Sequence, residues 1–230
     1  MADPLITRLE PLRPRGLRLR VHLCRGEPLE VALEAVERMG LGVGDPLPPN
    51  ARHHLLNADA DVKIREAALG LLSHRARTRA ELRRKLLDKG FGPARVDPCL
   101  DRLEDRGLLD DAAVASAFVR DRLRHRPRGK GRLTRELRAK GVADALARGV
   151  VDRVLEDEEV TDETLALQVV EGWLRRQGPG VIHALRSGAR SPEAEKARRR
   201  LHGYLARRGF GGPALSRAMD RATRPPDADA

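Results

Sequence analysis

Aromatic side chains are scarce in this sequence, which has three Phe, one Trp and one Tyr in 230 residues. Proteins dedicated to single-stranded nucleic acids stack bases on aromatic rings, and each stacked base contributes about 1–3 kcal/mol. The scarcity therefore argues against a binding site of that stacking type. Trp173 and Phe118 lie on apolar helical faces, a pattern that favours core positions.

Patterns for metal sites, disulfides and catalysis are also missing. Cys24 and Cys99 lie far apart and form no Cys-x-x-Cys motif, and the seven histidines show no metal-ligand spacing. The acidic run at 156–163 lacks the spacing of a calcium loop. Neither a glycine-rich phosphate loop nor a nucleophile–base pair is visible. We therefore expect a protein that is not an enzyme and needs no cofactor.

Long apolar runs are absent as well. No stretch approaches the roughly 18–20 apolar residues that a membrane helix needs. The first ten residues, MADPLITRLE, lack the apolar core of a signal peptide. We expect a soluble, cytoplasmic and monomeric protein.

Positive charge is what the sequence has in excess, with a formal net charge of +11 and a pI near 10.8. An excess of this size implies an anionic partner, most often nucleic acid. Residues 63–109 carry 12 Lys/Arg against 7 Asp/Glu, and residues 110–155 carry 12 against 6. Because residues 1–62 and 156–230 are nearly balanced, the excess lies in the middle of the chain.

The N-terminal segment, residues 1–62, differs from the rest. ITRLE, LRLRVHL and LEVALEA alternate apolar and polar side chains between Gly- and Pro-containing turns, which predicts short strands of a small antiparallel sheet. The segment EAVERMGLGVGDPLPP then predicts a short helix that glycines and prolines end.

The period changes to helical beyond residue 50, and from Val62 onward helices recur in three sets. We expect three-helix repeats at 63–109, 110–157 and 158–224, followed by a disordered tail at 225–230. The first repeat would open with a helix from Val62 to about Arg75. A helical unit of this size cannot bury its apolar face alone, so neighbouring units must stack. The predicted fold is mostly α, with tandem three-helix repeats in an elongated curved array and a small N-terminal β-rich segment.

Three glycines, Gly90, Gly141 and Gly209, align the repeats. Gly90 has the position of a left-handed residue that ends a helix. Five apolar columns then match across the three copies. They are Leu82/Leu133/Leu201, Leu86/Leu137/Leu205, Phe91/Val142/Phe210, Val96/Ala147/Leu215 and Leu100/Val151/Met219.

These motifs resemble the RecX family of recombinase regulators. The resemblance rests on AALGLLSHRARTRAELRRKLLDKGF and LEDRGLLDDAAVASAFVRDRLRHRPRGKGRLTRELRAKGV, and is strongest over residues 64–145. It implies tandem three-helix units that bind in the groove of a RecA filament on single-stranded DNA. It also implies that the protein blocks filament extension and dampens recombination, ATPase and coprotease activities. The positive charge allows single- or double-stranded DNA as a further partner, and the lack of long apolar runs predicts no membrane partner.

Candidate contact residues come from three basic segments. Around the Arg-Pro-Arg-Gly motif at 126–129, cations alternate with Pro and Gly. We interpret this segment as a flexible, phosphate-binding loop, with a solvated linker as the alternative. The second helices of the first and third repeats supply further cations, including Arg207 and Arg208; stabilising surface roles are the alternative there. The candidates are Arg79, Arg83, Arg84, Lys85, Arg124, Arg126, Arg128, Lys130, Arg132, Arg135, Arg138, Arg199 and Arg200.

Three hypotheses follow. The first is a filament-binding regulator, which the repeats and the family motifs favour. The second is an architectural protein that binds nucleic acid without sequence preference, which the charge supports equally. The third, an enzyme with hidden catalysis, is disfavoured because paired acids and phosphate loops are missing.

Overall fold

The computed structural model describes residues 3–12, 17–187 and 191–224. The predicted tail at 225–230 lies outside the described residues. The chain divides into two compact units: Met1–Arg77 with Glu81–Leu109, and Thr78–Ala80 with Asp110–Ala230. Each unit is described by itself.

The first unit begins with a three-stranded antiparallel sheet of order β1-β2-β3, which confirms the predicted strands. The strands are β1 (Ile6–Leu12), β2 (Arg18–Leu23) and β3 (Leu29–Ala32), followed directly by α1 (Leu33–Arg38). Val21 and Val31 alternate with polar residues and are fully buried. This face packs against α1 and the first half of α2 (Pro49–His74).

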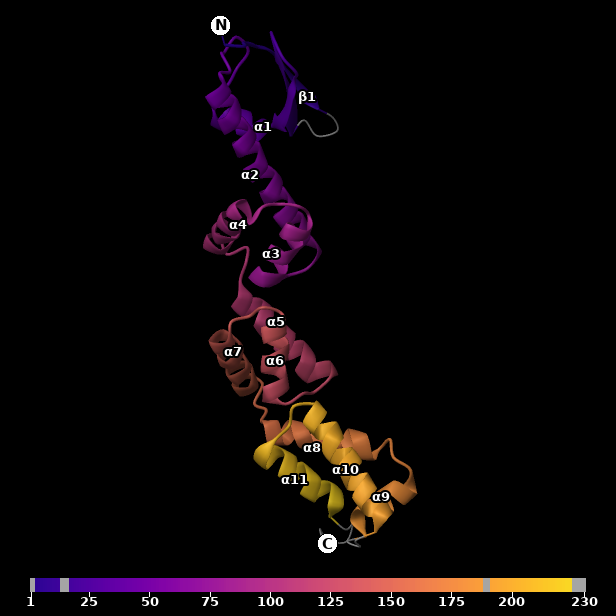
Figure 1. Ribbon diagram of the computed structural model, residues 1–230. Helices are drawn as coiled ribbons and strands as arrows, with labels where there is room; N and C mark the ends of the chain where they lie inside the picture. Colours follow the sequence, from indigo (N-terminus) through magenta and orange to yellow (C-terminus); the bar gives the residue numbers. More distant parts are fainter. Residues whose placement is uncertain (1–2, 13–16, 188–190, 225–230) are drawn as a thin grey trace. The chain divides into compact units, whose positions relative to one another are not determined.

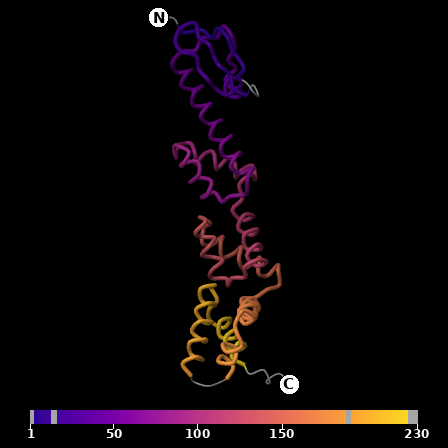
Figure 2. The backbone as a smooth tube through the Cα atoms, turned by 90° about the vertical axis from the view of Figure 1, so that its right-hand side faces the viewer, coloured from indigo at the N-terminus to yellow at the C-terminus, as the bar shows by residue number. Residues whose placement is uncertain are grey.

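The helix α2 runs away from the sheet (Figures 1 and 2) and contributes side chains to two apolar clusters. Leu55 and Val62 pack against the sheet, whereas Ile64 and Ala68 pack against α3 (Arg79–Asp88) and α4 (Pro93–Asp105). The predicted start at Val62 is therefore wrong, because the helix begins at Pro49. Proline at the first helical position has its φ preset and loses no hydrogen bond, so it starts the helix early.

A buried carboxylate ties α2 to the sheet. Asp59 is 3% exposed and accepts a hydrogen bond from the backbone N–H of Ala32 at 2.7 Å. Arg18 and Lys63 contribute ion pairs at 3.1 and 2.8 Å. The partners satisfy the buried charge, which would otherwise be costly.

The second unit contains seven helices within the described residues, around one apolar core (Figure 1). Its second repeat consists of three helices. The third repeat has four rather than the predicted three, because residues 179–186, in the long link between α8 and α10, form a helix of their own. In chain order the helices are α5 (Asp111–His125), α6 (Lys130–Ala139), α7 (Asp144–Asp157), α8 (Asp162–Leu174), α9 (Pro179–Arg186), α10 (Pro192–Arg207) and α11 (Gly212–Thr223).

The repeat alignment is confirmed at the level of side chains. Both leucine columns are completely buried in all three copies. Gly90, Gly141 and Gly209 have φ of +89°, +84° and +88°, the left-handed conformation that favours glycine after a helix. Trp173 is buried in the core as predicted. No helix of the described residues is long and apolar enough to cross a membrane.

Candidate polyanion-binding groove

Two junctions of the same geometry organise the second unit. Its residues Thr78–Ala80 lie at the start of α3, where the Arg79 backbone N–H donates to Asp111 Oδ1 at 2.7 Å. At the start of α6, the Lys130 N–H donates to Asp162 Oδ1, also at 2.7 Å. In each junction an aspartate that begins a helix, Asp111 of α5 or Asp162 of α8, therefore accepts a hydrogen bond from a backbone N–H at the start of another helix.

The same two junctions also use the carbonyl of the residue just before the glycine that ends α6 or α10. The Thr78 hydroxyl donates to the carbonyl of Lys140 at 2.6 Å, and the Gly129 N–H donates to the carbonyl of Arg208 at 2.9 Å. A Cβ on Gly209 would lie 2.4 Å from the Arg132 Cβ, so the backbones touch. This close approach brings the α5–α6 connection, residues 126–129, against the end of α10.

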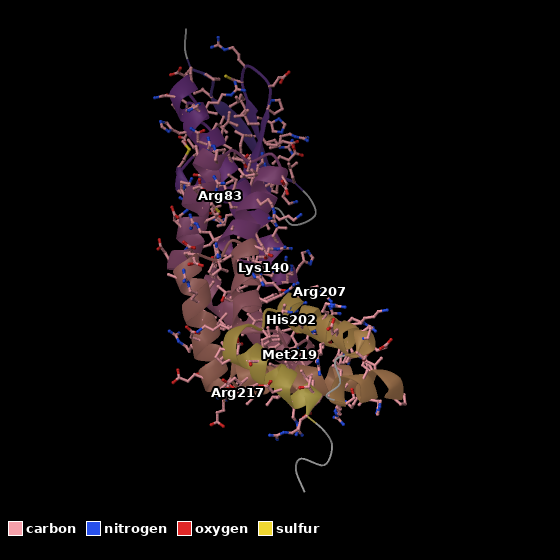
Figure 3. The ribbon with its side chains drawn as sticks, turned by 60° about the horizontal axis from the view of Figure 1, so that its bottom comes forward. Arg83, Lys140, His202, Arg207, Arg217 and Met219 are labelled. Atoms are coloured by element: carbon pink, nitrogen blue, oxygen red, sulfur yellow. The ribbon has the colours of Figure 1, made fainter. Side chains whose placement is uncertain are left out.

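The second junction opens into a surface that we call the Tyr204 groove. It consists of two hollows of about 520 Å³ each that share Tyr204. Their walls come from α8, α10 and the α5–α6 connection. Arg207, at the C-terminal end of α10, lines the groove, whereas Arg217 lies on α11 and is not part of the lining (Figure 3). The cationic residues that line the groove are Arg126, Arg175, Arg176, Lys196, Arg199, Arg200, Arg207 and Arg208, with His125 beside them.

Carboxylates are absent from the lining of this groove among the described residues. Among the eight Lys/Arg of the lining, only Arg199 has a described acidic partner within 4 Å, Glu195 at 3.3 Å, and both side chains are exposed. His125 lies 3.3 Å from Asp121, and this pair is exposed as well. Such exposed pairs contribute little. The remaining cations of the groove form no ion pair with a described carboxylate, so their field is directed to solvent.

Tyr204 has contacts on its ring and on its hydroxyl. Arg176 donates to the hydroxyl at 2.9 Å, and the Arg208 guanidinium lies 4.5 Å from the ring centroid. Trp173 contacts the same ring, with centroids 6.5 Å apart. Because these groups occupy Tyr204, the groove offers charge and hydrogen-bond donors to a ligand rather than a free stacking platform.

Three candidates of the second repeat form part of the internal scaffold instead. Glu136 accepts from Arg132 Nε at 2.7 Å and from Arg122 Nε at 3.4 Å, and it also pairs with Arg128. Burial, reinforced by the neighbouring arginines, lowers the pKa of Arg128. Lys130 pairs with Asp152. Since Lys130 is already helical, only residues 126–129 connect the helices, and the predicted flexible loop is much shorter than expected.

The other candidates of the second unit differ in their surroundings. Arg124 and Arg126 are exposed at the end of α5, and no described carboxylate pairs with them. Arg135 is exposed and donates to the carbonyl of Gly131 at 3.2 Å. Arg138 lies 3.4 Å from Asp144. Arg126 is therefore the candidate of this segment that reaches the Tyr204 groove, where it joins Arg199 and Arg200.

The first unit holds most of the remaining candidates. Arg83 forms a two-pronged ion pair with Asp97 at 2.7 and 3.2 Å. Arg84 and Lys85 are exposed on α3 without an acidic partner among the described residues. Arg79, whose backbone N–H belongs to the junction, has other contacts of its own. No group of three metal-ligating side chains occurs in the described part of the chain.

Sequence reasoning missed two arginines of the groove, Arg175 and Arg176. They directly follow the apolar helix TLALQVVEGWL, which reads as core. The available signal was the abrupt Arg-Arg pair at its end. Nothing in the sequence indicated that this pair would lie beside Arg126 from another repeat.

Comparison with known proteins shows that the chain is similar to proteins of one family. Models of the first and second three-helix domains of RecX match residues 65–103 and 110–150. A regulatory protein RecX from Halorhodospira halophila is 42% identical over 151 residues, which cover 66% of this chain and 83% of that protein. The chain belongs to the RecX family. A second RecX, from Prosthecochloris aestuarii, is 31% identical over 71% of this chain and 96% of the relative.

Solved RecX structures have the same fold. A crystal structure of regulatory protein RecX superposes with a TM-score of 0.73 at 22% identity, covering 94% of this chain and 99% of the other. RecX from Lactobacillus salivarius gives a TM-score of 0.54 at 20% identity, covering 72% and 97%. The relatives are named regulatory proteins rather than enzymes.

Proposed function

We propose that this chain is a regulator that binds a RecA filament on single-stranded DNA and blocks the filament's extension. Binding would inhibit the recombination, ATPase and coprotease activities of the recombinase. Family membership supports the choice of partner. The structural observation that carries the proposal is the Tyr204 groove, whose lining holds eight Lys/Arg and no acidic residue within the described part of the chain.

The chemistry of the groove suits a nucleoprotein polymer. Guanidinium groups present planar pairs of N–H donors to phosphate or carboxylate oxygens. A filament offers both, because it combines a DNA backbone with protein surface. We also propose that the repeats at 63–109, 110–157 and 158–224 act as separate modules, each of which adds contacts along the filament.

The test uses the single-strand-dependent ATPase activity of RecA. We expect inhibition at a molar ratio well below one chain per recombinase, because filament ends are far fewer than subunits. The groove variant is Arg126→Gln/Arg175→Gln/Arg200→Gln, which removes exposed cations without an acidic partner among the described residues. We expect this variant to need at least tenfold more protein for half-inhibition.

The matched control is Arg25→Gln/Arg52→Gln/Arg153→Gln, which removes the same charge from exposed residues outside the groove. It should inhibit nearly as well as the wild type. Equal loss in both triple variants would mean that net charge, rather than the groove, determines binding. No inhibition by the wild-type protein would contradict the regulator itself.

The groove also favours a second function, that of an architectural protein that binds nucleic acid without sequence preference. Cations without a free stacking surface contact the phosphate backbone alone. In that case the protein would bind naked DNA with a steep salt dependence and would leave the ATPase activity of RecA unchanged. Single- and double-stranded DNA would then be comparable ligands.

A further inference from the structure

A second cationic site lies in the first unit and shares no lining residue with the Tyr204 groove. A cavity of about 190 Å³ is enclosed by α1, α2, α4 and the residue that follows α4. Four arginines line it, one from each of these places: Arg38, Arg65, Arg102 and Arg106. Two carboxylates and Cys99 complete the polar lining.

Both carboxylates already have partners. Glu34 accepts two hydrogen bonds from Arg65, one of them 2.7 Å long, and these bonds lower the pKa of Glu34. Asp61 lies 3.3 Å from the guanidinium of Arg95, which stands outside the cavity. The negative charge of the lining is therefore matched by Arg65 and Arg95.

Three arginines remain uncompensated. Arg38, Arg102 and Arg106 are exposed, and their side chains form no hydrogen bond or ion pair with a described residue, although the charges of Arg38 and Arg106 also help to lower the pKa of Glu34. Cys99 is 2% exposed, and burial raises the pKa of its thiol, so it adds no negative charge at neutral pH. Three guanidinium groups thus border one small cavity whose two carboxylates are already paired with other arginines.

We propose that this cavity binds a phosphate group, supplied either as inorganic phosphate or pyrophosphate or as the terminal phosphate of a nucleotide. Arginine forks match phosphate oxygens, and a charge near −2 suits three free guanidinium groups. The cavity is smaller than the 300–1,000 Å³ typical of pockets that enclose a drug-sized molecule. It therefore encloses the phosphate, and any nucleoside stays outside.

Occupancy would link the N-terminal sheet layer to the first repeat, because Arg38 belongs to α1 and Arg102 to α4. A ligand that binds only the folded unit stabilises it by mass action. The site is independent of the RecA proposal, since it involves neither the Tyr204 groove nor the candidate residues of α3.

The test is calorimetric titration of the full chain with pyrophosphate, inorganic phosphate and ATP at constant ionic strength. We expect pyrophosphate to bind, and Arg102→Gln/Arg106→Gln to weaken its affinity at least tenfold. Arg52→Gln/Lys89→Gln, a control pair of exposed cations elsewhere in the first unit, should change affinity less than twofold. ATP binding at least tenfold tighter than pyrophosphate would identify a nucleotide as the source; comparable affinities would identify the free anion.

A local readout separates this cavity from the Tyr204 groove, which also attracts anions. In a Cys24→Ser background, Cys99 is the remaining thiol, and it lines the cavity. Saturating pyrophosphate should slow alkylation of Cys99 by iodoacetamide at least fivefold, and should not do so in Arg102→Gln/Arg106→Gln. Unchanged alkylation, unchanged affinity in this double variant, or equal protection by succinate would each overturn the proposal. The ATPase inhibition of RecA should be the same in this double variant as in the wild type, so the two proposals fail separately.

Discussion

Alanine at Gly209 should destabilise the second unit far more than alanine at Gly90 destabilises the first. The two glycines have nearly the same backbone conformation, with φ of +88° and +89°. A Cβ at Gly90 would have no heavy atom within 4 Å, whereas at Gly209 it would lie 2.7 Å from Arg132 N and 3.0 Å from its Cα. The pair therefore separates backbone strain from contact across the junction.

The magnitudes follow from these contacts. Both variants incur the left-handed penalty of roughly 1–2 kcal/mol for a residue with a Cβ. Gly209→Ala also overpacks the junction, which costs about 1–3 kcal/mol. It strains the Gly129 N–H to Arg208 carbonyl bond as well, with a net value of about 0.5–1.5 kcal/mol. We expect Gly209→Ala to lose about 2–4 kcal/mol more than Gly90→Ala.

The assay is urea denaturation followed by two signals. Trp173 is the single tryptophan and is buried in the second unit, so its fluorescence reports on that unit. Far-UV circular dichroism reports on helices of both units. Gly209→Ala should lower the fluorescence midpoint clearly, and Gly90→Ala should leave it nearly unchanged. Equal losses of unfolding free energy in the two variants would refute the close backbone contact and leave only the φ requirement.

Three further expectations concern single side chains. Leu133→Ala should cost about 2–5 kcal/mol in the same urea experiment, because the side chain is completely buried; a loss under 1 kcal/mol would contradict its core position. Asp162→Ala should lower the free energy of unfolding by about 1 kcal/mol, because it removes the acceptor of the Lys130 N–H. Asp162→Asn keeps an acceptor and should lower it less. The reverse order would contradict this hydrogen bond. Hydrogen bonds from Arg65 hold the pKa of Glu34 below 4.5, so the unfolded chain takes up this proton first as the pH falls. The stability that this pair contributes should be present above pH 4.5 and be lost below it, and Glu34→Gln should flatten that part of the stability–pH profile.

Much of the fold follows from local sequence. The leucine columns repeat at helical spacing, and burying them is the main gain that a helix of this length can make. Glycine recurs where each second helix ends because a left-handed residue is needed there. Asp110 accepts from the Ala113 N–H at 2.9 Å and caps α5. These features depend on residues within a few positions of each other, so periodicity detects them.

Features that depend on contacts between distant residues could not be predicted from the sequence. The early start of α2 at Pro49 reflects its packing against the sheet as well as against the first repeat. The link in the third repeat became α9 because Leu185 could bury completely against neighbouring helices. In both cases tertiary contacts stabilised a helix that the local pattern left open.

The sequence by itself determined that the chain is basic, helical and repeated, because charge and periodicity are sums over neighbouring residues. Only the tertiary structure decided which cations are available. Arg128 and Arg132 are held by Glu136, whereas Arg126 joins Arg175 in the Tyr204 groove. Whether an arginine meets a carboxylate within 4 Å or faces solvent depends on how separate helices pack, and distances of that kind are not encoded in the spacing along the chain.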